Sequence, residues 1–202
     1  MATETVTASF GNMAAPHLST EEFDSVSIYN MTGQIRSWTN STYALTNPST
    51  YADVPFSISD LGISKALDFT RDFVTDFSIP PTATITYLRP RVYAYYGGML
   101  HAVYYVNIIG SETEQFTLNK FSTNPYGAYP NVGEVSGDWG ISNAQAIAFL
   151  DGTNPLRLWA RDTSNTLAVS ARCYYVVMTA EWTYESTLAT AEGALPIGMF
   201  NY

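Results

Sequence analysis

Two consecutive prolines, Pro80 and Pro81, place the strongest constraint on how this chain can fold. Proline has a fixed φ and no backbone N–H, so neither residue can lie inside a helix or donate to the ladder of a central strand. The backbone before a proline is pushed towards extended geometry, so Ser78 and Ile79 are expected to be extended. Residues 84–88 then form a run rich in β-forming side chains. The segment predicts that one strand ends, the chain makes a rigid crossing, and another strand begins.

Further β-forming runs, separated by turn residues, continue to the end of the chain. Gly97 and Gly98 lie between two such runs and predict a two-residue β-hairpin, because both positions tolerate positive φ. Residues 167–184 carry apolar side chains on both faces of the alternation, which predicts a central strand. Only residues 142–149 hint at a helical period. Strand runs with turns every ~8–12 residues predict an all-β fold, an antiparallel β-sandwich or jelly roll.

Interruptions in the strand pattern predict edges and bends. Pro55, within the alternating residues 54–58, predicts an edge strand, and Pro90 must lie at an edge or a bulge. The alternation that begins at Leu67 drifts after Phe69, which predicts a bulge or bend near Asp72.

The chain of 202 residues is long enough for one β domain with a sizeable core. We expect an N-terminal arm over residues 1–32, a β-sandwich domain over 33–185, and an irregular tail over 186–202. The arm is polar with isolated apolar residues. It could fray, or it could extend onto a neighbouring subunit, where the aromatic rings of Phe10 and Phe23 would suit pockets in the partner.

Charge and composition exclude several classes of function. The net charge is −9, with 9 basic residues scattered along the chain. Nucleic-acid binding needs clustered basic residues, so we expect no nucleic-acid partner, and binding to an anionic membrane surface is disfavoured for the same reason. The single cysteine, Cys173, allows no disulfide framework. We see no signal peptide and no apolar run of transmembrane length, and therefore expect synthesis in a host cytoplasm without secretion.

The sequence offers no set of residues that forces a chemistry. Only two histidines are present, His17 and His101, and no phosphate-binding loop or nucleotide motif occurs. Asp151 and Asn154 could offer oxygen atoms to calcium, but two ligands fall short of the six to eight that calcium takes. A pair of carboxylates for glycoside hydrolysis is a further hypothesis, although the acidic residues fall mainly in turns. We expect no catalytic residue, no cofactor and no metal site, and hence a protein that is not an enzyme.

The best candidate for a contact surface is the long loop over residues 119–139. Long loops inside a compact domain tend to be functional, and this one carries Tyr126, Tyr129 and Trp139. The loop could instead cover one end of the sandwich, with Trp139 filling the core. With Phe10 and Phe23 of the arm, these aromatic residues form the predicted contact surface.

The order of features over residues 38–184 resembles a group of small virion proteins of tailed bacteriophages that have a β-sandwich. The resemblance depends on the pattern Ile-Pro-x-x-Ala-x-Ile at residues 79–85 and on a later Trp-Gly at residues 139–140. It implies a structural or attachment part of the virion: a head decoration, neck or tail component. It further implies a homo-oligomer without catalytic residues that contacts other virion proteins.

A carbohydrate-binding module or receptor-binding adhesin is the alternative function. Exposed tyrosine and tryptophan side chains on β-sandwiches often stack against sugars, so Tyr126, Tyr129 and Trp139 would be the residues that contact a host glycan. The two functions are compatible, because a phage receptor-binding protein fulfils both.

Overall fold

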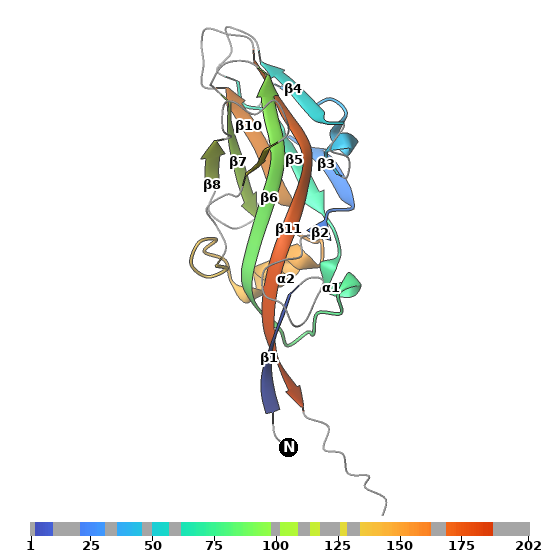
Figure 1. The fold of residues 1–202 in the computed structure, drawn as a ribbon, viewed down its shortest axis with the longest axis vertical. Helices are drawn as coiled ribbons and strands as arrows, with labels where there is room; N and C mark the ends of the chain where they lie inside the picture. The colour runs from blue at the N-terminus through green and yellow to red at the C-terminus, as the bar shows by residue number, and fades with distance from the viewer. Residues whose placement is uncertain are drawn as a thin grey trace, which may run out of the picture.

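The computed structural model of the chain is an all-β sandwich of two antiparallel sheets, which confirms the predicted fold class (Figure 1). Apolar side chains on the facing sides of both sheets form one core. The structure describes residues 3–9, 21–30, 36–45, 50–56, 62–97, 102–108, 114–117, 126–128, 134–162 and 169–187.

The larger sheet contains β1 (Thr3–Ser9), β2 (Glu21–Glu22), β4 (Ala52–Phe56), β6 (Thr84–Gly97), β9 (Tyr126–Ala128) and β11 (Val169–Thr187). The smaller sheet has the strand order β3 (Ser25–Tyr29), β5 (Ala66–Thr70), β10 (Leu156–Asp162), β7 (Ala102–Ile108) and β8 (Glu114–Thr117). The helical elements are the short 3-10 helix η1 (Ser41–Ala44), α1 (Phe73–Asp76) and α2 (Asn143–Leu150).

β11 is the central strand of the larger sheet and pairs along both of its edges, as the sequence predicts. One edge pairs with β6 over residues 170–183. The other edge meets three short strands in succession: β4 pairs with residues 169–173, β2 with residues 177–178, and β1 with residues 181–187. β11 therefore fixes the positions of four other strands.

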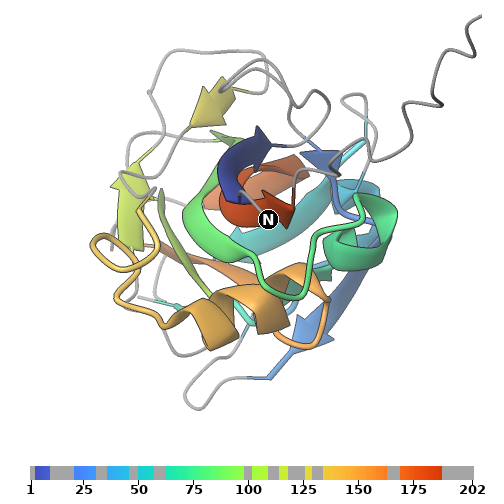
Figure 2. The ribbon, with the colours of Figure 1, turned by 90° about the horizontal axis from the view of Figure 1, so that it is seen from below.

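The first 32 residues do not form a separate arm in the described part of the chain. β1 and β2 pair with β11, and β3 is an edge strand of the smaller sheet. Figure 2 shows β1 lying against the end of β11 when the molecule is viewed along its long axis. These strands are short and mostly exposed, so backbone pairing places them and the hydrophobic pattern gives little sign of it. The tail beyond Thr187 lies outside the described residues.

Phe23 is buried where the chain crosses from one sheet to the other, between β2 and β3. Its ring centroid lies 5.6 Å from that of Phe69, 5.6 Å from that of Phe73 and 6.3 Å from that of Phe149. Only 1% of Phe23 is exposed. The prediction that Phe23 faces a partner is therefore wrong: it fills the chain's own core, because the crossing turns the side chain inwards.

The predicted hairpin at Gly97 and Gly98 is also wrong. β6 pairs with β11 and β9, whereas β7 pairs with β10 and β8 in the opposite sheet. Both strands contribute apolar side chains to the same core, among them Val92 of β6 and Val106 of β7. Two facing layers bury these side chains together, and a local turn signal carries no information about long-range pairing.

The drift in the pattern near Asp72 comes from a helix. Asp72 is the N-cap of α1, and its carboxylate accepts hydrogen bonds from the backbone N–H of Thr75 at 2.9 Å and from the Thr75 hydroxyl at 2.6 Å. These hydrogen bonds lower the pKa of Asp72. A cap of this kind satisfies an N–H that the first turn of a helix leaves without a partner.

Ser78 ends α1 in a left-handed conformation, with φ of +51°, so the prediction of an extended Ser78 is wrong. Its N–H donates to the carbonyl of Thr75 at 3.3 Å, and the N–H of Ile79 donates to the carbonyl of Val74 at 3.0 Å. This pattern is a Schellman motif, whose hydrogen bonds outweigh the local preference for extended backbone. A turn closed by Ala83 N–H and Pro80 C=O at 2.9 Å follows, and the chain enters β6 as predicted. The element that ends before the prolines is α1, so the prediction of a strand there is wrong.

The proline positions agree with their predicted roles. Pro55 lies in β4, which pairs with no strand other than β11 among the described residues; on its other side Asp53 forms an isolated bridge with Thr39. Pro90 lies in β6 opposite Met178, outside the residues 92–94 that pair with β9. The missing N–H of Pro90 is therefore tolerated on the side of β6 that faces away from β11.

Residues 134–143 cover the lower edge of β6, which is the stretch over residues 85–88 that does not pair with β9. Trp139 lies fully buried there, and Asn143 begins α2, whose N-cap Ser142 forms a capping box with Gln145. This α-helix confirms the helical hint in the sequence. Hydrogen bonds between residues 134–143 and this edge protect it from pairing with another chain. They run from Trp139 Nε1 to Leu88 O (2.7 Å), Val135 N to Thr86 O (3.2 Å), Asn143 Nδ2 to Ala83 O (3.0 Å) and Ile85 N to Asn143 Oδ1 (2.7 Å).

The conformation of Ser78 generates a stability prediction. Ser78→Gly removes the Cβ that is unfavourable at positive φ, so we expect the free energy of unfolding to rise by about 0.5–1 kcal/mol after the added chain entropy of glycine in the unfolded state. Urea denaturation measures the change. Ser78→Ala keeps the Cβ and serves as the control, and equal stability of the two variants would contradict the prediction.

Candidate functional site

The structure does not bring the predicted contact residues together on one surface. Phe23 and Trp139 are buried, with Trp139 fully enclosed and hydrogen-bonded to β6. The backbone of Tyr126 lies in β9, and its side chain is outside the described part of the molecule, as are Phe10 and Tyr129 altogether. Trp139 fills the core because an indole at this position both packs among apolar side chains and satisfies the Leu88 carbonyl. It therefore offers no surface to a sugar or a partner.

A gap in the strand pairing of β11 forms the most distinctive surface feature of the described residues. Ala52, the first residue of β4, pairs with Cys173, and Glu22, the last residue of β2, pairs with Val177. The pairing of β11 with β6 also shifts register between Cys173 and Tyr175, which marks a β-bulge. Bulges redirect side chains and interrupt pairing, and they occur often near functional sites.

A groove of about 410 Å³ opens beside this gap. Its size falls within the range of small-molecule sites in proteins. The walls come from β2, β6 and β11 of the larger sheet and from the segment that connects β5 to α1. The lining residues are Glu21, Glu22, Arg71, Tyr93, Tyr175 and Val177.

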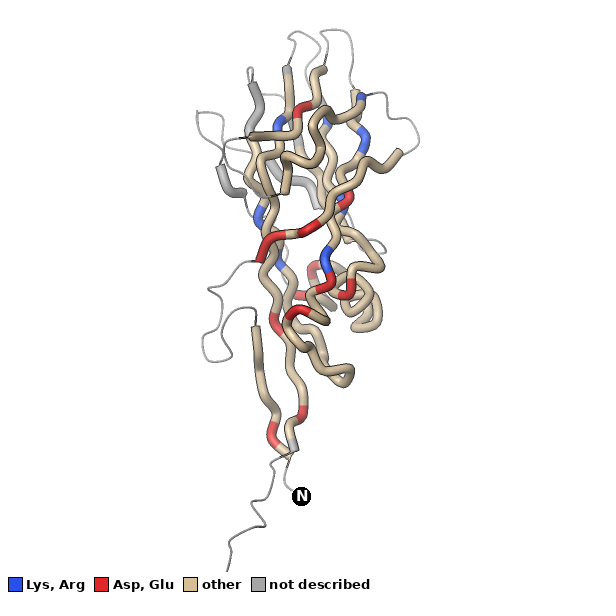
Figure 3. The backbone as a smooth tube through the Cα atoms, turned by 90° about the vertical axis from the view of Figure 1, so that its right-hand side faces the viewer, with Lys and Arg blue, Asp and Glu red and all other residues tan. Residues whose placement is uncertain are grey.

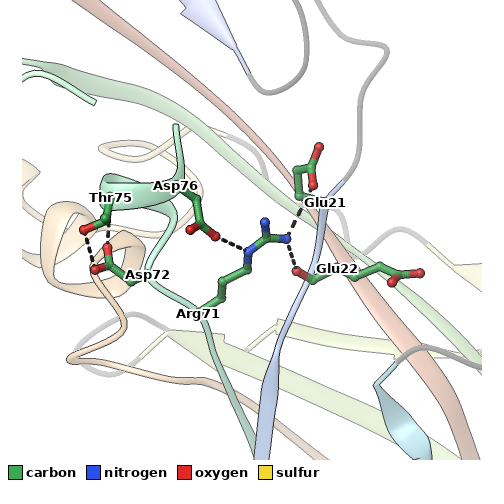
Figure 4. Close-up of polar contacts among 6 residues, drawn as sticks. All are labelled: Glu21, Glu22, Arg71, Asp72, Thr75 and Asp76. Atoms are coloured by element: carbon green, nitrogen blue, oxygen red, sulfur yellow. Dashed lines mark hydrogen bonds and ion pairs between the residues drawn. The ribbon is translucent and has the colours of Figure 1, made fainter. Parts of the chain in front are cut away.

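Arg71 holds one wall of the groove together (Figure 4). Its Nε donates to Asp76 Oδ2 at 2.7 Å, and its Nη1 donates to the backbone carbonyl of Glu22 at 2.7 Å. The same Nη1 lies 3.4 Å from Glu21 Oε2. The guanidinium also lies over the Phe73 ring, 5.1 Å from its centroid. Arg71 thus ties β2 to α1 and fixes both glutamates beside the groove.

Two stacked tyrosine rings form the opposite wall. Tyr93 of β6 and Tyr175 of β11 are register partners, and their ring centroids lie 4.0 Å apart at an interplanar angle of 14°. The Arg91 guanidinium lies over Tyr93, 4.5 Å from the centroid. Burial and the hydrogen bond with Tyr93 raise the pKa of Tyr175 from 10.0 to about 12. Tyr175 is therefore a neutral hydroxyl under ordinary conditions.

A second polar cluster, on the outer face of the smaller sheet, is closed by its own contacts. Arg157 of β10 donates to both carboxylate oxygens of Asp68, at 2.8 and 2.7 Å, and stacks over Tyr29 with 3.6 Å to the ring centroid. The hydrogen bond to Asp68 raises the pKa of Arg157. This bidentate pair satisfies the buried carboxylate and joins β5 to β10, so it has a structural role.

β1 and the end of β11 form a two-stranded ribbon that projects beyond the sandwich (Figure 1). The pairing with β6 stops at Thr183, whereas β1 continues alongside β11 as far as Thr187. β1 is the terminal strand of its sheet, and most of its side chains are exposed. Figure 3 shows that charged positions are sparse along the backbone and that those near the end of the ribbon are acidic. Glu4 of β1 and Glu185 of β11 lie in this projecting part.

The described residues contain no group of three or more His, Cys, Asp or Glu side chains that could hold a metal ion. No helix among them is long and apolar enough to cross a membrane. Cys173 is buried, which raises its thiol pKa and makes it a poor nucleophile. Asp151, considered above for calcium, accepts a hydrogen bond from the backbone N–H of Thr153 at 2.8 Å.

Comparisons of the chain with protein-family models, with curated proteins and with solved structures find no match.

Sequence reasoning did not find the groove, because its residues come from four separate segments with no shared motif. Glu21 and Glu22 belong to the predicted arm, and Arg71 belongs to the stretch whose pattern drifts. Tyr93 and Tyr175 occur in predicted strands, but only the pairing of β6 with β11 brings them together. The sequence signal for the groove was limited to Tyr93 and Tyr175, one tyrosine in each of two strands that were predicted to belong to the same domain.

The raised pKa of Tyr175 predicts a difference in stability at alkaline pH. A group whose pKa is higher in the folded state contributes stability that is complete below pH 10.0 and is lost as the pH rises to about 12. Tyr175→Phe lacks this contribution. The free energy of unfolding of the natural protein should therefore fall relative to that of Tyr175→Phe over this pH range, as measured by urea denaturation.

Tyr93→Phe removes the hydroxyl partner of Tyr175 and serves as the comparison. It should move the titration of Tyr175 towards 10.0, because the hydrogen bond is one cause of the raised pKa. A constant difference between the natural protein and Tyr175→Phe across this range would contradict the assignment.

Proposed function

We propose that this protein is a non-enzymatic structural subunit of a tailed-bacteriophage virion that assembles into a homo-oligomer through β1. The projecting ribbon of β1 and β11 carries this proposal. An isolated two-stranded ribbon is marginally stable in water, and an exposed edge presents N–H and C=O groups that readily pair with another strand. A subunit whose sheet ends in such a ribbon is suited to assembly.

β1 lacks the features that usually prevent edge-to-edge pairing. It contains no lysine, arginine or proline, and Glu4 is its only charged residue. Its remaining residues are threonine, valine, alanine and serine, which are small or β-branched and suit a strand interface. The lower edge of β6, by contrast, is covered by residues 134–143. The difference between the two edges supports β1 as the assembly edge.

A second copy of the chain is the partner that β1 fits best. In an antiparallel pair of β1 strands related by a two-fold axis at Val6, Thr5 lies opposite Thr7, and Glu4 lies opposite Ala8. No like charges face each other in this register, and cross-strand threonine and valine pairs are favourable. The same patch on both subunits makes the interface isologous, as in most symmetric dimers.

Sequence features support the virion as the place of assembly. The resemblance to small phage virion proteins spans residues 38–184, and only 13% of the residues are charged. A net charge of −9 would limit adhesion to the phage DNA. Head decoration, neck and tail components remain the three proposed positions, with other virion proteins as additional partners.

Thr5→Lys tests the pairing of β1. The added ammonium group lies opposite Glu185 of the chain's own β11, so the ribbon within one subunit is retained. At the interface with a second copy, each lysine lies opposite Thr7 and diagonal to the lysine of the other copy on the same face, where the two like charges repel. We expect the natural protein to form a discrete oligomer in mass photometry and the variant to dissociate at roughly tenfold higher concentration, for a loss of about 1.4 kcal/mol.

Ser25→Lys is the matched control, because it places a lysine on β3, the exposed edge strand of the other sheet. It should keep the oligomer of the natural protein. A monomer for the natural protein, or equal dissociation of both variants, would overturn assembly through β1. Deleting residues 1–32 is a poorer test, because it also removes Phe23 from the core.

The virion assignment has a separate test. An antibody raised against the purified protein should label intact tailed particles from a phage lysate in which this chain is encoded, as seen by immunogold electron microscopy. Absence of the chain from purified particles, by labelling and by mass spectrometry, would overturn the assignment.

A further inference from the structure

We propose that the groove lined by Glu21, Glu22, Arg71, Tyr93, Tyr175 and Val177 binds a neutral sugar residue of a glycan. This inference does not depend on assembly through β1. It replaces the predicted sugar surface around Trp139, which is buried.

The aromatic wall is suited to the apolar face of a sugar ring. Tyr175 stacks on Tyr93 with one face of its ring, on the side of β6. Tyr175 also lines the groove together with Glu21 and Glu22 of β2, which lies on the side of β11 away from β6. Aromatic rings bind apolar surfaces, including the C–H faces of sugars, at little cost in conformational entropy.

The missing strand neighbour leaves room in front of Tyr175. β2 pairs with residues 177–178 and then ends, because Phe23 turns into the core and the chain crosses to the other sheet. β4 pairs with β11 only up to Cys173. No described strand therefore occupies the position beside Tyr175, and the open space is bounded by the polar wall.

The polar wall offers both acceptors and donors of hydrogen bonds. Glu21 contacts Arg71 through Oε2, and Glu22 contacts it through its backbone carbonyl, so Glu21 Oε1 and the Glu22 carboxylate form no hydrogen bond or ion pair with other described residues. Arg71 uses Nε and Nη1, and its Nη2 has no hydrogen-bond partner among the described residues (Figure 4). A carboxylate and a guanidinium side by side match adjacent sugar hydroxyls, which both donate and accept.

The charges of the groove select for neutral sugars. Two carboxylates and one guanidinium line it, and Asp76 neutralises Arg71 further through the contact at 2.7 Å. A sugar that carries a carboxylate or phosphate would therefore meet net negative charge. The hydroxyl pair of Tyr93 and Tyr175 adds an uncharged polar edge, since Tyr175 remains protonated at ordinary pH.

Saturation-transfer-difference NMR with defined monosaccharides tests the proposal on the full chain. The probes are D-glucose, D-galactose, N-acetyl-D-glucosamine and L-rhamnose, with N-acetylneuraminic acid as the anionic comparison. We expect transfer to at least one neutral sugar and none to N-acetylneuraminic acid. Tyr175→Leu and Glu22→Ala should each weaken binding roughly tenfold, because the first removes the stacking surface and the second a charged acceptor.

Tyr174→Leu is the matched control. Tyr174 is the neighbouring residue of β11, and its ring packs against Tyr51 at 5.2 Å, outside the groove. Glu22 is exposed, so Glu22→Ala decides the outcome even if Tyr175→Leu fails to fold. No transfer to any of the neutral sugars, or equal binding by Glu22→Ala and the natural protein, would overturn the proposal.

Mass photometry of the same samples separates the two proposals. Loss of sugar binding in a groove variant that keeps the oligomer of the natural protein would locate the sugar site independently of β1. Sugar binding by a Thr5→Lys monomer would support the groove while the assembly proposal is judged by its own test.

Discussion

The pairing of β11 along both of its edges is the constraint on which the rest of the structure depends. A strand of 19 residues is too long for any single partner here, so β6 covers one edge and three short strands share the other. Both candidate surfaces follow from that division. The groove lies where β4 and β2 leave part of β11 without a neighbour, and the ribbon lies where β1 extends beyond the end of β6.

Phe23 and Arg71 together hold the open side of the sandwich. The ring of Phe23 packs among three other phenylalanines, and full burial of such a side chain contributes about 1.5–3 kcal/mol. Arg71 then joins β2 to α1 at the surface above it. One crossing of the chain therefore joins the two sheets, ends β2 and places two glutamates at the groove.

The sequence predicts those parts of this fold that local physics decides. β11, α2 and the crossing at Pro80 and Pro81 follow from apolar faces, a helical period and the fixed geometry of proline. The sheet to which each strand belongs could not be predicted, because Gly97 and Gly98 signal a turn without naming the partner of either strand. The groove was missed for the same reason: its two walls meet only through long-range pairing, and the aromatic residues that seemed available, Phe23 and Trp139, fill the core instead.

The geometry of the ribbon also determines how the molecule would respond to force. Thr3 and Thr187 are paired neighbours at the tip of two antiparallel strands. Tension applied between these two points acts across the ladder, so the backbone hydrogen bonds would open one pair at a time, like a zipper. Load applied between Thr187 of β11 and Gly97 of β6, which lie at opposite ends of the two paired strands, would instead shear the backbone hydrogen bonds between β6 and β11 together. The domain is therefore mechanically soft in one direction and stiff in the other.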